Sequence, residues 1–140
     1  MIVLDTSGLL AALDATERRH GPASAALRAA EGPRLLSPFV LAELDYLLAR
    51  RVSSKVASAL LGEVAAGAYQ LEPFDSADVA SAITQLERYA DLDLGLADAS
   101  ILVLAARHGT TDILTLDERH FRAVRDSAGR SFRLLPADLT

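Results

Sequence analysis

Four acidic residues interrupt or close apolar stretches of this 140-residue chain, namely Asp5, Glu43, Asp98 and Asp117. Each stands where a buried strand or the apolar face of a helix is expected. A carboxylate that faces a core is costly unless a positive group meets it. No lysine or arginine recurs beside these acids at a matching spacing. A divalent cation is the simplest compensation, so the pattern predicts metal-dependent chemistry.

The residue types also indicate which metal and which reaction. The chain has no cysteine, so a thiolate metal site is excluded. Hard oxygen ligands favour Mg²⁺, for which Mn²⁺ can substitute, over zinc. Such an ion activates a bound water and neutralises the leaving oxygen, which suits phosphodiester hydrolysis. A covalent route is disfavoured because no nucleophile with an adjacent base is recognisable.

The elements that must position these acids alternate between short apolar runs and longer amphipathic ones. The apolar runs predict strands at 2–5, 34–37, 69–74, 113–116 and 132–135. The amphipathic runs predict helices at 6–13, 22–32, 38–51, 53–67, 75–90 and 96–108, the first of them capped by Thr6 and the last followed by Gly109. Strands that are apolar throughout indicate an α/β fold, with a central mostly parallel sheet of about five short strands and helices on both faces. No linker interrupts the pattern, so one domain over residues 1–140 is expected.

This arrangement predicts that the four acids converge. Ligands bind outside the carboxyl ends of parallel strands, and Asp5 and Asp117 each end a predicted strand. Asp98 falls in the first turn of its helix, and Glu43 must reach in from another helix. Four separate elements would therefore supply one site.

Each acid also has a structural interpretation. Asp5 could serve only as a helix cap, Asp98 could stabilise a helix dipole, and Asp117 could start a turn. If the helical phase is one position out, Asp45 replaces Glu43 as the ligand. Asp93 is expected to be a solvated loop residue. The apolar residues of the first and fourth helices, including Leu61, are expected to belong mostly to the core.

The charge distribution limits the possible partners. The net charge of -5 argues against a simple electrostatic nucleic-acid binder, although 15 acidic residues face 14 basic ones once the four candidate ligands are set aside. Arginines crowd the last 34 positions, and Arg119 and Arg122, just after Asp117, are candidates for RNA contact. His20, His108 and His120 are not expected to be ligands: His20 follows Arg18-Arg19 in a loop, where it is solvated or weakly phosphate-facing, and His108 is explained by helix capping. No apolar run approaches a membrane span and no signal segment is recognisable, so a cytoplasmic location is expected.

Four ordered motifs give the chain a family resemblance. They are Val3-Leu4-Asp5-Thr6-Ser7, the segment 37–44 around Glu43, the segment 95–101 around Asp98, and the segment 113–121 around Asp117. Together they resemble those of PIN-domain ribonucleases of the VapC toxin type, over nearly the whole chain. An aspartyl phosphatase of another α/β fold would need a second acid at the position of Ser7, so that alternative is remote.

The resemblance implies a three-layer fold and a Mg²⁺-dependent endonuclease that cuts structured RNA such as tRNA or rRNA. It further implies a homodimer and a cognate, DNA-binding VapB-like antitoxin that blocks the site. By motif, Asp5, Glu43, Asp98 and Asp117 would be the catalytic acids and metal ligands. Thr6 would orient a carboxylate or a metal-bound water, and Thr115 would support the ligands. The alternative is a catalytically silent scaffold that binds RNA or protein and holds a structural metal.

Overall fold

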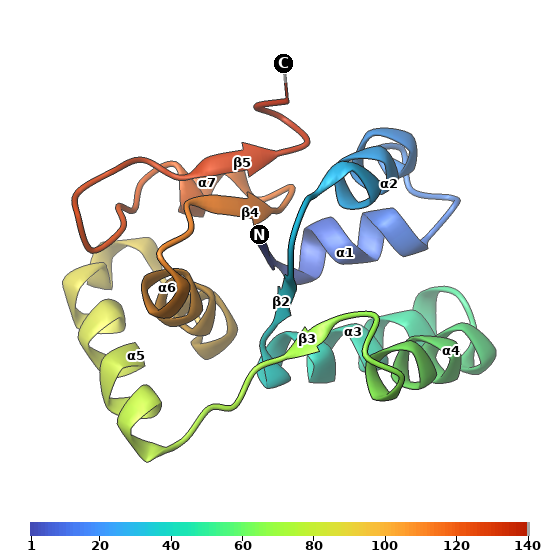
Figure 1. Ribbon diagram of the computed structural model, residues 1–140, viewed down its shortest axis with the longest axis horizontal. Helices are drawn as coiled ribbons and strands as arrows, with labels where there is room; N and C mark the ends of the chain where they lie inside the picture. Colours follow the sequence, from blue (N-terminus) through green and yellow to red (C-terminus); the bar gives the residue numbers. More distant parts are fainter. Residues whose placement is uncertain (140) are drawn as a thin grey trace.

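A five-stranded parallel sheet forms the centre of the computed structural model, which describes residues 1–139 (Figure 1). Its strands are β1 (Ile2–Leu4), β2 (Arg34–Leu36), β3 (Gln70–Leu71), β4 (Asp112–Leu114) and β5 (Arg133–Leu135). They lie in the order β3-β2-β1-β4-β5, and every neighbouring pair is parallel. The predicted fold class is therefore confirmed. All five carboxyl ends lie along one edge of the sheet.

Helices cover both faces of this sheet. They are α1 (Thr6–Leu13), α2 (His20–Ala29), α3 (Pro38–Arg51), α4 (Ser54–Ala65), α5 (Ser76–Arg88), α6 (Leu96–His108), the short α7 (Glu118–Phe121) and the 3-10 turn η1 (Ala90–Leu92). Figure 1 shows α5 and α6 on one side of the strands and α1 and α2 on the other, with the α3–α4 pair beside β2 and β3. None of the described helices combines the length and the apolar character that crossing a bilayer requires.

The middle of the sheet is the most deeply buried part of the molecule. Val3 of β1 pairs with Leu35 of β2 on one side and with Ile113 of β4 on the other. All three side chains are fully buried. A strand enclosed by helices on both faces has no solvated side, which explains why these strands are apolar at every position.

Local signals in the sequence account for several element ends. Pro38 opens α3 behind Ser37, whose hydroxyl accepts a hydrogen bond from the Phe39 amide. Gly109 ends α6 in the left-handed conformation, with φ at 66°. The predicted bounds of α3 and α6 therefore agree with the structure.

Other expectations are wrong in detail. Asp5, not Thr6, occupies the N-cap position of α1, and no side chain caps that helix. The run 69–74 forms only a two-residue strand at the edge of the sheet, and both of its residues are exposed. The helix α7 is not among the predicted elements, since four residues are too few to show a helical period. Leu61 is 43% exposed and does not belong to the core.

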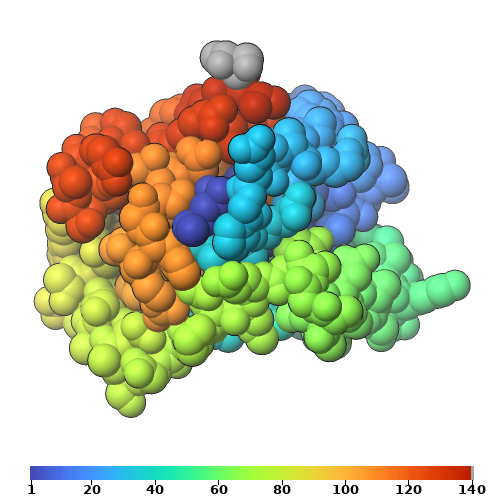
Figure 2. Space-filling view, viewed as in Figure 1, coloured from blue at the N-terminus to red at the C-terminus, as the bar shows by residue number. Residues whose placement is uncertain are grey.

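The amino end of the sheet is closed by the N-terminus. Figure 2 shows the first residues between the segments of β2 and β4. The terminal amine bonds to the Glu31 carbonyl, and the Thr110 hydroxyl donates to the Met1 carbonyl over 3.1 Å. The functional groups described below lie at the opposite, carboxyl ends of the strands.

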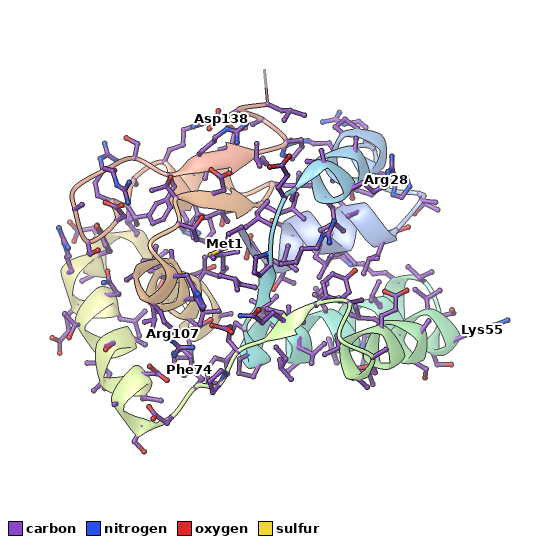
Figure 3. All side chains as sticks on the ribbon, in the orientation of Figure 1. Met1, Arg28, Lys55, Phe74, Arg107 and Asp138 are labelled. Carbon is purple, nitrogen blue, oxygen red and sulfur yellow. The ribbon has the colours of Figure 1, made fainter. Side chains whose placement is uncertain are left out.

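A buried carboxylate ties the edge strand to α6. Glu72 follows β3 and accepts hydrogen bonds from Gln70, Arg107 and His108. Arg107 also pairs with Asp78 over 2.9 Å, and Figure 3 shows it beside Phe74. His108 therefore belongs to this network, which corrects its expected role as a helix cap.

Candidate active site

All four acids selected from the sequence line one pocket of about 430 Å³ at the carboxyl edge of the sheet. Asp5 follows β1, Asp98 lies in the first turn of α6, Glu43 projects from α3, and Asp117 precedes α7. Their exposure differs, which corrects the expectation that all four face a core. Asp5 alone is buried, at 5% exposure, whereas Asp98 and Asp117 are half-buried and Glu43 is exposed. Asp45, the alternative to Glu43, does not line this pocket.

Asp5 is held by two hydroxyls from different elements. Its Oδ2 accepts hydrogen bonds from Ser7 Oγ over 2.8 Å and from Thr115 Oγ1 over 2.6 Å. Thr115 directly follows β4, and its amide donates to the Leu135 carbonyl at the end of β5 over 2.9 Å. Burial raises the pKa of Asp5 to about 6; the hydrogen bonds from Thr115 and Ser7 oppose this shift, and the charge of Asp98 adds to it.

The same hydroxyls fix the chain around Asp117. Ser7 Oγ accepts from the Leu116 amide over 2.9 Å, and Thr115 Oγ1 accepts from the Asp117 amide over 2.9 Å. Sequence reasoning missed Ser7, although its place two residues after Asp5, in the first turn of a helix, was a usable signal. The close approach that brings Ser7 here depends on the next residue, since a Cβ on Gly8 would lie 2.3 Å from the Leu114 carbonyl oxygen.

Glu43 and Asp98 are each held by one hydrogen bond. Thr6 Oγ1 donates to Glu43 Oε1 over 2.6 Å, which joins α1 to α3. The Gly95 amide donates to Asp98 Oδ2 over 3.1 Å at the start of α6. Burial raises the pKa of Asp98; the Gly95 hydrogen bond and His120 oppose this, while Asp117 and Glu43 add to it. The acids are therefore close enough to repel one another.

Asp117 has a structural role as well as its place in the pocket. Its Oδ1 accepts from the His120 amide over 3.0 Å as the cap of α7, and its Oδ2 lies 2.8 Å from His120 Nδ1. Sequence reasoning could not place His120 here, because it did not foresee α7. Within residues 1–139, His120 is the only basic side chain that lies within ion-pair distance of any of the four acids.

The remaining candidates lie further along the chain. Arg122 pairs with Glu118 over 2.8 Å and with Asp138 over 2.7 Å, so its guanidinium is already engaged by carboxylates. Arg119 is exposed on α7. Neither arginine lines the pocket, whereas Arg51, which sequence reasoning did not select, does.

The donor set fits a hard divalent cation, with one geometric condition. Only oxygen ligands face the pocket, and their mutual repulsion is what such an ion would relieve. As the side chains stand, no three Asp, Glu or His residues within 1–139 are arranged to hold an ion directly. Since Mg²⁺ keeps several of its waters, an ion here would contact part of the set through water, or the side chains would turn from their present hydrogen bonds.

The parallel sheet, in the order β3-β2-β1-β4-β5, and the acidic pocket at the carboxyl ends of its strands agree with the class of protein that the four motifs resemble. The family model for the PIN domain matches residues 2–126, and the chain belongs to this family. Among its relatives, the protein named Ribonuclease VapC26 from Mycobacterium tuberculosis is 42% identical over 135 residues, which cover 96% of this chain and all of the relative.

Solved structures support the same fold. The crystal structure of Mycobacterium tuberculosis VapC20, a toxin described as cleaving the sarcin-ricin loop, superposes with a TM-score of 0.79 at 24% identity. The match covers 85% of this chain and 92% of that one. FitAcB from Neisseria gonorrhoeae matches with a TM-score of 0.59 at 26% identity, covering 84% of this chain and 88% of that one.

Proposed function

We propose that the protein is a Mg²⁺-dependent endoribonuclease of the VapC type that hydrolyses phosphodiester bonds in structured cellular RNA. The observation that carries the proposal is the convergence of four carboxylates from four separate elements on one pocket. The 42% identity to a protein named as a ribonuclease supports the reaction class. The substrate would be tRNA or rRNA, and the reaction would take place in the cytoplasm.

The metal site would use Asp5, Glu43, Asp98 and Asp117 as its acids. Mg²⁺, or Mn²⁺ in its place, would activate water and neutralise charge at the phosphate. Thr115 and Ser7 hold Asp5 in one orientation, and Thr6 does the same for Glu43. Such support from neighbouring hydroxyls fixes ligand geometry before the substrate arrives.

The same residues can move the proton that hydrolysis releases. Attack of a water oxygen on phosphorus would break the bond to the 3′ oxygen, leaving a 5′-phosphate and a 3′-hydroxyl. Asp98 is the candidate acceptor for the water proton, because its Oδ1 accepts no hydrogen bond from residues 1–139, and the proton would then pass to the departing 3′ oxygen. Arg119 would contact the RNA backbone, whereas Arg122 would first have to release Glu118 and Asp138.

The test of the reaction is cleavage of total RNA in the presence of Mg²⁺. We expect discrete fragments with 5′-phosphate ends from the wild type and none from Asp98→Ala. Fragments that persist undiminished in the variant would point to a contaminating nuclease. The silent-scaffold alternative predicts that Asp5→Asn leaves growth inhibition in a host cell unchanged.

The proposed partners follow from the same family. We propose a homodimer and a cognate VapB-like antitoxin that binds DNA and blocks the pocket. Co-expression with the cognate VapB-like antitoxin should yield a stable complex in which RNA cleavage is lost. Light scattering of the isolated chain measures its oligomeric state independently.

A further inference from the structure

One wall of the acidic pocket is formed by α3, and beyond Glu43 its residues have no part in the proposed metal chemistry. Glu43, Tyr46, Leu47 and Arg51 all line the pocket from α3. Their spacing of three, four and eight residues places them on one face of the helix. From Glu43 to Arg51 this face extends roughly 12 Å along the helix axis. The wall therefore leads from the acids towards the end of α3.

Tyr46 presents an aromatic surface on this wall. The side chain is 57% exposed although it lines a pocket. The guanidinium carbon of Arg50 lies 4.6 Å from the ring centroid, so a cation already covers one face of the ring. An exposed ring held in this way is a ready platform for a flat ligand, because nucleobases stack on aromatic side chains whatever their sequence.

Arg51 adds a positive charge at the far end of the wall. It is exposed, and no ion pair within residues 1–139 involves it. Asp14 lies near enough for Arg51 to contribute to the lowered pKa of that carboxyl, but hydrogen bonds from Thr16 lower it more. The guanidinium thus remains available to a phosphate, which it can contact with two donors at once.

We propose that Tyr46 and Arg51 form a nucleotide-binding subsite beside the four acids, in which a base stacks on Tyr46 and a backbone phosphate contacts Arg51. Leu10 and Leu47, which also line the pocket, would lie against the apolar parts of the nucleotide. The subsite rests on the proposed nuclease function and adds to it the residues that position the RNA strand. Single-stranded nucleic acids are commonly held in this way, by a cation on the backbone and an aromatic ring under a base.

The first measurement compares a nucleotide with its base-free counterpart. Adenosine 5′-monophosphate and ribose 5-phosphate are titrated into the protein with millimolar Mn²⁺ present. We expect the nucleotide to bind about tenfold more tightly, because base–aromatic stacking contributes on that scale. The chain has three tyrosines and no tryptophan, so quenching of tyrosine fluorescence offers a second readout alongside calorimetry.

Variants then assign the preference to individual side chains. Tyr46→Ala should remove the preference for the nucleotide, and Tyr46→Phe should retain it because the ring is kept. Arg51→Ala should weaken both ligands by a similar factor and reduce the salt dependence of binding. Arg28→Ala is the matched control, since it removes the same charge from α2, beside a different pocket (Figure 3). It should change neither affinity.

Kinetics separate this subsite from the nuclease assignment. With RNA as substrate, Tyr46→Ala should raise KM about tenfold and lower kcat much less. Equal affinities for the nucleotide and ribose 5-phosphate in a wild type that cleaves RNA would overturn the subsite alone. If the wild type prefers the nucleotide to ribose 5-phosphate but cleaves no RNA, the nuclease assignment is overturned and the subsite stands. If Tyr46→Ala binds the nucleotide normally but loses a protein partner, this face is a protein interface and the proposal is wrong.

Discussion

At the scale of single residues, Asp5 is a carboxylate held almost entirely out of water. It is buried, it shares a pocket with three other acids, and within residues 1–139 only neutral hydrogen-bond donors compensate its charge. Hydroxyls stabilise an ionised carboxylate less than a positive charge does. The pKa near 6 is the consequence of this imbalance.

The first prediction concerns the pH dependence of stability. The pKa of Asp5 is about 6 in the folded protein, against an ordinary value of 3.8. Between pH 3.8 and pH 6 the folded protein therefore keeps a proton on Asp5 that the unfolded chain releases. Asp5 alone should therefore cost metal-free protein about 2 kcal/mol of stability as pH rises from 4 to 7. Asp5→Asn should remove this loss and stabilise the metal-free protein at pH 7. Urea unfolding at several pH values in the presence of a chelator measures both, and an unchanged profile in Asp5→Asn would contradict the assignment.

The second prediction concerns the hydroxyl that contacts Asp5 most closely. Thr115→Val keeps the shape of the side chain but removes the donor to Asp5 Oδ2 and the acceptor for the Asp117 amide. We expect Mn²⁺ affinity to fall about 10- to 100-fold, as for other groups that support metal ligands. Titration calorimetry gives the affinity. Thr84→Val, on the exposed face of α5, is a control that should leave it unchanged.

At the scale of elements, the packing of α1 against β4 determines whether Ser7 and Asp5 meet Thr115. The contact is so close that only glycine fits at position 8. A neighbouring backbone cannot move aside as the end of a side chain can, so an added methyl group must displace the helix.

The third prediction follows from this contact. Gly8→Ala should destabilise the protein by about 1–3 kcal/mol or more and reduce RNA cleavage, because α1 must shift away from β4. Gly62→Ala is the matched control: it lies within α4, where an added Cβ would meet no atom within 4 Å, and should raise stability by up to about 1 kcal/mol. Denaturant midpoints of the two variants should therefore move in opposite directions.

At the scale of the whole molecule, the fold gathers like charges at one edge of the sheet and balances them only in part. His120 pairs with Asp117, but Asp5, Glu43 and Asp98 have no cationic partner at ion-pair distance within residues 1–139. The repulsion among them is a cost of folding that a bound cation would remove.

The fourth prediction is that Mn²⁺ raises the melting temperature. At a hundred times its dissociation constant, an ion that binds only the folded state adds about 2.7 kcal/mol, which corresponds to several degrees. Asp98→Ala should show a much smaller rise, and Asp93→Ala, whose loop residue lies outside the pocket, should behave as the wild type. If the wild type melts at the same temperature with and without millimolar Mn²⁺, the acids do not form a metal site.

The sequence by itself determined the order of the longer elements and the four acids that they carry. Apolar strands, Ser37-Pro38 before α3 and Gly109 after α6 are local signals, and local signals act through the backbone of the same few residues. That is why Asp5, Glu43, Asp98 and Asp117 could be selected before any contact between them was known.

Only the tertiary structure decided how these groups are held and what surrounds them. The bonds from Thr115 to Asp5 and from Thr6 to Glu43 join residues 110 and 37 positions apart. Such contacts depend on strand register and helix packing, which no local pattern encodes. The exposure of Glu43, the short α7 that brings His120 to Asp117, and the place of Tyr46 and Arg51 in the pocket have the same origin. Each results from the way distant segments fill the space between them.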